Sequence, residues 1–304
     1  MSERTLKLLL IAVVGLAVLW LGVSYFPGGG GGSAGPSEDM ATLFDDVTPE
    51  SVSRLSLRGP AGEEEIDLRR ENGEWKVNGF RADSATVARF WEALKEAEVG
   101  DLVASNPANH PRMGVSADSA WTMELGLAGG SRSLLMGSSG ARYGTSFVRL
   151  PDADQVYLLT GNLRSQVTRS LDDWRNKRVA TVDTAGVWRI ELERDEGGYT
   201  LERADSLWVL GDGAEANPTS VRGILGEIAR LDATGFYEEG DSLPGLEATL
   251  RALDQAGGVR LILEVGSGEG DRWVRAAGDS ITYQVASWRV SRLLPDLEAV
   301  TGGG

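Results

Sequence analysis

The sequence predicts an α+β fold: an N-terminal transmembrane helix followed by two tandem repeated units, each a mostly antiparallel sheet with helices packed on one face. Three observations predict it: one long apolar run near the N-terminus, a glycine-rich spacer behind it, and an order of short strands and helices that occurs twice. The regular alternation of strand and helix that marks a doubly wound parallel sheet is missing, so a Rossmann-type fold is not expected.

The apolar run is Leu8–Phe26, with 19 consecutive uncharged residues. A helix of that length is about 28 Å long, which matches one crossing of a bilayer. Arg4 and Lys7 precede the run and the next basic residue is Arg54, so the N-terminus is expected in the cytoplasm and the rest of the chain outside it. A cleaved signal peptide is the alternative, but its apolar region typically has only about 7 to 15 residues. Residues 1–26 are therefore expected to be a cytoplasmic stub and a membrane anchor.

Behind the anchor, the chain is expected to divide into a linker, two units and a tail. Residues 27–44 form a glycine-rich linker, and no helix or Gly-Lys-Ser/Thr pattern follows the glycines as a phosphate-binding loop would need. The first α+β unit is expected at 45–179 and the second at 180–300, and 301–304 is expected to be a flexible tail.

Two amphipathic helices of the same pattern mark the two units. Asp83 and Asn217 are good N-cap residues, and Pro218 lies at the first helical position, where proline is favoured. Apolar residues with the spacing of one helix face follow each cap: Val87, Phe90, Trp91 and Leu94 in the first helix, and Val221, Ile224, Leu225 and Ile228 in the second.

The strands that flank these helices also match in order. Three short strands precede each helix: Arg54–Leu57, Glu65–Arg69 and Glu74–Val77 in the first unit, and Trp188–Leu192, Tyr199–Arg203 and Leu207–Leu210 in the second. Late in each unit a strand with a tyrosine, Val156–Leu159 or Thr282–Val285, runs into a helix, expected near 161–174 and 287–300.

The composition excludes several classes of function. The chain has 30 basic and 45 acidic residues, a formal net charge of −15, one histidine and no cysteine. A disulfide, a thiolate nucleophile, a cysteine zinc site and a multi-histidine metal centre are therefore impossible within one chain. Nucleic acid and anionic lipid are disfavoured as main partners, since phosphate binding needs clustered basic residues. We expect no metal, no cofactor and no nucleic acid partner.

No local pattern points to catalysis, and no catalytic residue is predicted. His110, the one histidine, lies in a loop with two prolines and is expected to be structural. Gly137–Gly144 lacks the lysine or helix start of a phosphate loop and predicts a hairpin that brings Tyr143 and Phe147 to one region. Calcium-loop spacing is also missing from the two acidic clusters, Glu63–Glu65 and Glu238–Asp241.

The polar stretch Asp172–Arg178 is the strongest local candidate for a contact with a partner. It ends the first predicted unit, and connecting segments carry function more often than strands do. An ordinary solvated helix end is the alternative. The predicted partner-binding residues are Trp174, Arg175, Lys177 and Arg178. Two other tryptophans have no clear place in the pattern, Trp273 and Trp288.

Several segments carry a family resemblance: the opening Leu43–Leu57, the hairpin strand Asn72–Val77, the strands Gly144–Arg149 and Val156–Leu159, and the stretch Leu171–Arg178. Together they resemble bacterial proteins of the family DUF 4340, from residue 42 to about residue 240. The resemblance carries over no catalytic residue. It implies an envelope protein, because many members are encoded beside ABC-type transporter components of the gliding-motility auxiliary type.

The sequence thus predicts a non-enzymatic, single-pass protein of the bacterial inner membrane. Its periplasmic ectodomain is expected to bind protein partners, ABC transporter subunits among them, as an accessory of a transport or gliding-motility-like complex. An alternative is an envelope hydrolase or glycan-binding protein that uses acidic and tryptophan side chains in a cleft between the units. A scaffold whose binding leaves transport unchanged is the third reading. The sequence does not define an oligomeric state.

Overall fold

A computed structural model describes residues 35–301 except 62, 196 and 239. The predicted anchor, 8–26, and linker residues 27–34 lie outside the described residues. Among the helices that are described, none has the length and apolar character needed to cross a membrane. Contacts divide the described residues into two compact units, 35–67 with 89–168 and 68–88 with 169–301.

One antiparallel sheet of the described chain has nine strands in the order β4-β3-β2-β1-β6-β7-β8-β9-β5. Its core contains fully buried apolar residues from β1, β6 and β7, such as Leu57, Met123 and Leu134. The strands are β1 (Val52–Arg58), β2 (Ile66–Glu71), β3 (Glu74–Val77), β4 (Phe80–Arg81), β5 (Glu98–Ala104), β6 (Trp121–Leu127), β7 (Gly130–Ser139), β8 (Thr145–Arg149) and β9 (Val156–Thr160). The accompanying helices are α2 (Glu38–Ala41), α3 (Ser84–Lys95), η1 (Pro107–Asn109), α4 (His110–Met113), α5 (Leu163–Val167) and α6 (Leu171–Trp174).

A second antiparallel sheet in the described residues has eight strands in the order β13-β12-β11-β16-β17-β18-β19-β15. Its strands are β11 (Arg189–Arg194), β12 (Tyr199–Ala204), β13 (Leu207–Leu210), β15 (Gly235–Tyr237), β16 (Leu246–Leu253), β17 (Val259–Gly266), β18 (Arg272–Ala276) and β19 (Thr282–Val285). Beside it lie the strand pair β10 (Arg178–Ala180) and β14 (Leu231–Asp232), and the helices η2 (Thr184–Gly186), α7 (Pro218–Ala229), α8 (Ser287–Leu293) and α9 (Leu297–Thr301).

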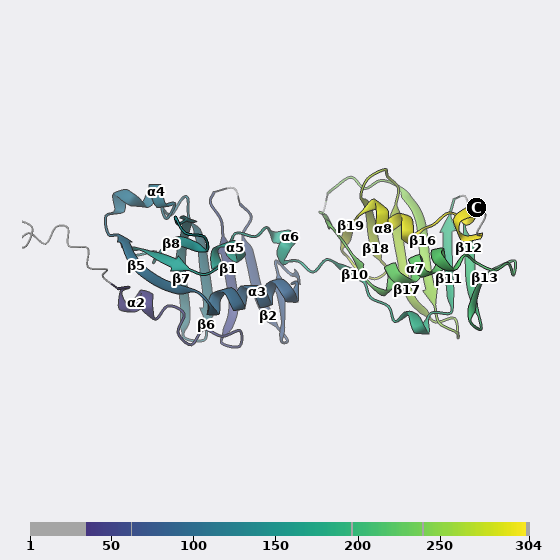
Figure 1. Ribbon diagram of the computed structural model, residues 1–304, viewed down its shortest axis with the longest axis horizontal. Coiled ribbons are helices and arrows are strands. Elements are labelled where there is room, and N and C mark those ends of the chain that lie inside the picture. The colour runs from purple at the N-terminus through teal and green to yellow at the C-terminus, as the bar shows by residue number, and fades with distance from the viewer. Residues whose placement is uncertain (1–34, 62, 196, 239, 302–304) are drawn as a thin grey trace, which may run out of the picture. The chain divides into compact units, whose positions relative to one another are not determined.

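Helices α7 and α8 lie across one face of the eight-stranded sheet (Figure 1). Ile224 and Ile228 of α7 and Val290 of α8 are fully buried in one cluster with strand residues such as Ile190 and Leu250. Burial of this apolar helix face fixes the two helices on the sheet, since each such side chain contributes about 1.5 to 3 kcal/mol on transfer from water. The prediction of an α+β fold with antiparallel sheets is confirmed.

Both predicted amphipathic helices and their caps are confirmed. The Asp83 carboxylate accepts a hydrogen bond from the backbone N–H of Thr86 at 2.7 Å at the start of α3. At the start of α7, Asn217 Oδ1 accepts from the backbone N–H of Thr219 at 2.9 Å, and Pro218 is the first helical residue. The predicted apolar faces are buried except for Trp91 and Leu225, which are half-buried.

The two predicted late helices are each interrupted, which corrects the continuous spans 161–174 and 287–300. The first span is α5 and α6, because the backbone of Ser170 is extended and its hydroxyl donates to Asp173 Oδ2 at 2.9 Å at the start of α6. The second span is α8 and α9, separated by Pro295, which has no N–H and disfavours helical geometry in the residue before it.

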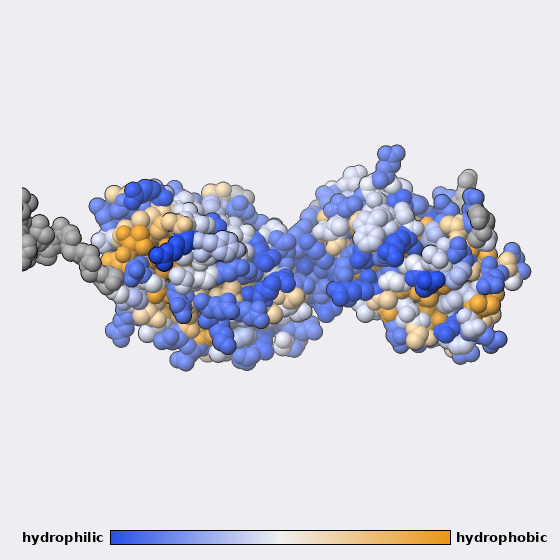
Figure 2. Space-filling view, in the orientation of Figure 1, coloured by the Kyte–Doolittle hydropathy of each residue, from blue (hydrophilic) through white to orange (hydrophobic). Residues whose placement is uncertain are grey.

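The predicted hairpin at Gly137–Gly144 is confirmed as the turn between β7 and β8. The grouping of its two aromatic rings is wrong. Tyr143 is fully exposed at the tip, whereas Phe147 packs against a buried cluster that contains Met113 and Val156. Polar residues cover most of the face seen in Figure 2, and apolar areas are small and scattered.

Candidate functional site

Two of the predicted partner-binding residues are buried in the protein interior. Trp174, at the end of α6, is 0% exposed, and Arg175 is 3% exposed. The Arg175 guanidinium lies between two aromatic rings, 4.1 Å from the ring centre of Phe80 and 3.6 Å from that of Phe236. Arg175 also pairs with the carboxylate of Glu238. Cation–π stacking and ion pairing therefore give Arg175 a structural role, and neither side chain is available to a partner in this conformation.

The other two predicted residues remain partly exposed. Lys177 is half-buried, and its backbone carbonyl accepts a hydrogen bond from the backbone N–H of Ala233 at 2.8 Å. Arg178 lies in β10 directly opposite Asp232 of β14, so its Nε donates to the Asp232 carboxylate as a cross-strand pair. Partner binding by this stretch stays a prediction, and Lys177 and Arg178 are the side chains that can take part in it.

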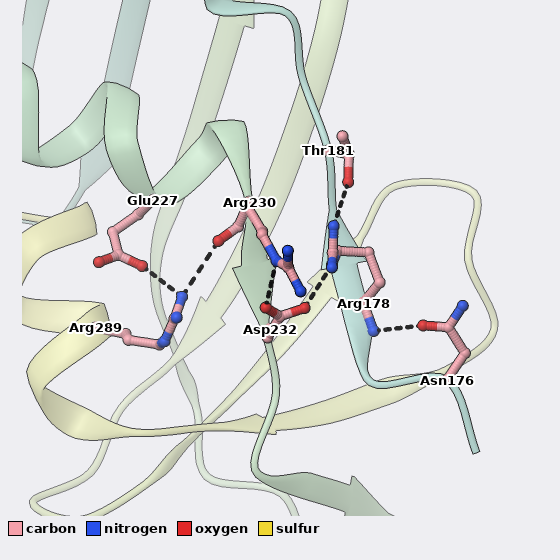
Figure 3. A network of polar contacts seen from close by, with 7 residues as sticks. All are labelled: Asn176, Arg178, Thr181, Glu227, Arg230, Asp232 and Arg289. Atoms are coloured by element: carbon pink, nitrogen blue, oxygen red, sulfur yellow. Dashed lines mark hydrogen bonds and ion pairs between the residues drawn. The ribbon is translucent and has the colours of Figure 1, made fainter. Parts of the chain in front are cut away.

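Arg178 belongs to a larger network of arginines (Figure 3). Asp232 also accepts a hydrogen bond at 2.9 Å from Arg230, the C-cap residue that follows α7. Burial raises the pKa of Asp232, but hydrogen bonds from Arg178 and Arg230 lower it more, so the net pKa is below the ordinary value. One carboxylate is thus shared by two guanidinium groups.

A second carboxylate shared by two arginines, that of Glu227, lies on α7 about one turn before Arg230. Glu227 is 5% exposed and accepts from Arg289 Nη1 of α8 at 2.8 Å, while Arg292 Nη1 lies 3.6 Å from its other oxygen. Arg289 Nη1 also donates to the backbone carbonyl of Arg230 at 3.3 Å, which joins the two carboxylate pairs (Figure 3).

A tryptophan borders this network. Trp288 is 54% exposed, and the guanidinium carbons of Arg289 and Arg292 lie 5.0 and 6.0 Å from its ring centre. Of the tryptophans left unassigned by sequence, Trp273 is instead buried and donates its indole N–H to the Pro244 carbonyl at 2.8 Å. Trp288 is therefore the exposed member of that set.

We call this group the arginine–tryptophan surface and define it by Arg178, Glu227, Arg230, Asp232, Trp288, Arg289 and Arg292. Four arginines face two carboxylates, which leaves two positive charges in excess on a chain whose formal net charge is −15. Of these seven residues, the sequence predicted only Arg178 as a partner-binding residue. The available signal was the Trp-Arg-x-x-Arg order of 288–292, which puts both arginines within one turn of the tryptophan on a helix.

The residues considered for catalysis have structural partners. His110 is buried in α4, and its Nε2 lies 2.9 Å from the backbone carbonyl oxygen of Asp154. In the acidic clusters, Glu65 accepts from the Ser56 hydroxyl at 2.9 Å and Glu238 pairs with Arg175, while residue 239 lies outside the described residues. Across the described part of the chain, no three His, Asp or Glu side chains are grouped as metal ligands would be.

Comparison with known proteins gives one match. Neither a curated protein nor a solved structure matches the chain. The model of the family described as "Domain of unknown function (DUF4340)" matches residues 75–255, which run from β3 to just past β16. Because the match covers more than half of the sequence, the chain belongs to the DUF4340 family.

Proposed function

We propose that this protein is a non-enzymatic, single-pass protein of the bacterial inner membrane whose periplasmic ectodomain binds protein partners as an accessory of an ABC-type transport or gliding-motility-like complex. The observation that carries the binding role is the arginine–tryptophan surface, in which an exposed tryptophan lies among preordered arginines. Tryptophan and arginine are the residue types that most often dominate the binding energy of protein interfaces.

The surroundings of the polar residues support binding in preference to catalysis. A general base needs access to a substrate proton, whereas His110 is buried against a backbone carbonyl. Membrane attachment rests on the predicted anchor, 8–26, and the named complex rests on the genomic setting that the family resemblance implies.

The proposal includes two tandem units, 45–179 and 180–300, behind the anchor and linker. The strand orders support it, because β3-β2-β1-β6-β7-β8-β9-β5 and β13-β12-β11-β16-β17-β18-β19-β15 follow the same succession along the chain. Apart from the two-residue strands β4 and β14, both units begin with three strands and a 12-residue helix, then place the following strand, β5 or β15, at the far edge, with four later strands between. A duplicated unit explains this agreement without separate origins for the two sheets.

Copurification tests the proposed function. The tagged full-length protein is extracted from its native membrane in mild detergent, and the proteins recovered with it are identified by mass spectrometry. A chain without residues 1–26 serves as the control for the anchor. We expect stoichiometric ABC-type membrane subunits with the full-length chain; recovery of the protein alone, with its anchor intact, would contradict the accessory role.

A further inference from the structure

We propose that the arginine–tryptophan surface binds an acidic polypeptide segment of the partner, one that also places an apolar side chain against Trp288. This inference deepens the proposed function, on which it rests, by assigning the chemistry of the partner and the residues that contact it.

The charge of the surface selects an acidic partner. Arg230 and Arg292 keep 69% and 60% of their side-chain surface exposed although each contacts a carboxylate. A guanidinium has five N–H donors in a planar fork, so each retains donors for a second carboxylate in bidentate geometry. The excess of arginine over carboxylate here is opposite in sign to the net charge of the chain, so it attracts acidic segments that the rest of the chain tends to repel.

The internal carboxylates prepare the surface for binding. Glu227 is almost fully buried, accepts a hydrogen bond from Arg289 and lies 3.6 Å from Arg292, while Asp232 accepts hydrogen bonds from both Arg178 and Arg230. Side chains that are ordered before association lose less conformational entropy when the partner arrives, so more of the contact energy appears as affinity.

Trp288 supplies the apolar part of the contact. More than half of its side chain is exposed, and the two neighbouring guanidinium groups lie beside the ring. An acidic segment with an interspersed leucine or phenylalanine covers the ring and the arginines at once. An acidic chain without apolar side chains leaves the Trp288 ring exposed, so it lacks the binding free energy that comes from burying that ring.

A second tryptophan–arginine pair lies on a surface where carboxylates match the arginines in charge. Trp188 lies 5.3 Å from the guanidinium carbon of Arg203. Carboxylates are abundant there, since Arg189 pairs with Glu202 at 2.9 Å and Asp254 lines the same depression. With its positive charge matched, that site offers no net attraction to an acidic chain, and Arg203 provides the matched control for Arg292.

The experiment measures the anisotropy of a short fluorescein-labelled peptide of alternating Glu and Leu residues, titrated with the full-length protein in mild detergent. A peptide with Gln in place of each Glu tests the charge requirement. The protein variants are Trp288→Ala, Arg292→Gln and the control Arg203→Gln, and circular dichroism with thermal unfolding verifies that each is folded. We expect the Glu peptide to bind, with an affinity that falls about tenfold or more between about 50 and 200 mM salt. Trp288→Ala and Arg292→Gln should each weaken binding about tenfold, and Arg203→Gln should leave it unchanged.

Several results would overturn the inference: no binding of the Glu peptide, equal binding of the Gln peptide, an equal loss in Arg203→Gln and Arg292→Gln, or displacement of the peptide by vesicles of anionic lipid or by single-stranded DNA at comparable charge concentration. The proposed function fails separately. Binding of the peptide as expected, with the protein recovered alone from membranes, contradicts the accessory role and leaves this inference intact. Copurification of ABC-type subunits without peptide binding contradicts this inference and leaves the accessory role intact.

Discussion

Two groups of arginines, one near each sheet, have different roles. Near the nine-stranded sheet, Arg132 and Arg149 donate to backbone carbonyls. Beside the eight-stranded sheet, Arg178, Arg289 and Arg292 instead share carboxylates and border an exposed tryptophan. An arginine whose donors are directed at the backbone stabilises the local fold, whereas one that shares a carboxylate and stays exposed remains available for recognition.

Arg149 shows the first role most fully. It is buried at the end of β8, and its guanidinium donates to the carbonyls of Val115 at 2.7 Å and Pro151 at 2.8 Å, and also to those of Leu150 and Ala153. Desolvation by burial lowers the pKa of Arg149 from its ordinary value, although Asp154 and Asp152 oppose the shift. Arg149 thus supplies a donor to four backbone carbonyls, of which Leu150 also accepts from the backbone N–H of Ala153.

Arg132 plays the same part for the segment that enters the nine-stranded region. One of its terminal nitrogens donates to the carbonyls of Leu43 at 2.8 Å and Asp45 at 2.7 Å. Met40 of the same segment is fully buried, and the backbone N–H of Ser37 donates to the Tyr157 hydroxyl at 3.1 Å. The described part of the predicted linker, residues 35–44, is therefore fixed to the sheet rather than extended as a free spacer.

The largest expected effect comes from Arg149→Met. Several carbonyls lose their donor within the protein at once, so we expect the free energy of unfolding to fall by about 3 kcal/mol. Denaturant titration measures it, with Arg142→Met as control, because Arg142 is exposed in the neighbouring turn and should change stability by less than about 0.5 kcal/mol. Equal losses in the two variants would show that the carbonyl contacts carry no special stability.

Glu227→Gln tests the arginines that share a carboxylate. A neutral amide no longer balances Arg289 and Arg292, and we expect a loss of about 2 kcal/mol in unfolding free energy. Glu298→Gln, at an exposed position of α9, is the matched control and should cost less than about 0.5 kcal/mol. If the cluster were an ordinary surface network, both variants would lie within error of the wild type.

Acid titration separates the carboxylate-sharing arginines from the others. Because the pKa of Asp232 is lowered in the folded state, the unfolded chain binds the proton first, and the stabilisation present above pH about 4 is lost as the pH falls through the folded-state pKa. Asp232→Asn should therefore be less stable than the wild type at neutral pH, with a difference that shrinks below pH about 4. If the difference in unfolding free energy between Asp232→Asn and the wild type stayed constant across this pH range, the lowered pKa of Asp232 would be refuted.

Arg132→Met should give the smallest global effect and the most local one. Loss of the carbonyl contacts should release the entering segment without unfolding the sheet, at a cost of about 1 kcal/mol or less. Hydrogen exchange should accelerate at the hydrogen-bonded amides of Ala41, Thr42 and Asp45 and remain unchanged in β6 and β7. Uniform acceleration across the nine-stranded sheet would mean that the segment is part of the cooperative core.

The local features of the fold were predictable from the sequence because they depend on near neighbours. The caps of α3 and α7 and the strands Glu74–Val77 and Leu207–Leu210 follow from short-range patterns. Burial of Trp174 and Arg175 was not predictable, since the polar residues around them suggest a solvated segment. The aromatic rings that enclose Arg175 come from β4 and β15, which lie far from it in the sequence.

The candidate site was mostly hidden for the same reason. Arg178 was predicted as a partner residue, but the network joins it to α7 and α8 through contacts such as Arg289 to Glu227, 62 residues apart. Composition even argued against a basic surface, because a net charge of −15 averages over both regions and conceals a local excess of arginine. Only the folded arrangement of the helices gathers that excess beside Trp288.

Site-specific cross-linking in the native membrane tests most directly whether the arginine–tryptophan surface meets the partner. Benzoylphenylalanine replaces Trp288 in one full-length variant and Tyr143, fully exposed at the β7–β8 turn, in another. We expect an adduct with an ABC-type membrane subunit from position 288 and none from position 143. An adduct from position 143 alone, or equal adducts from both, would contradict it.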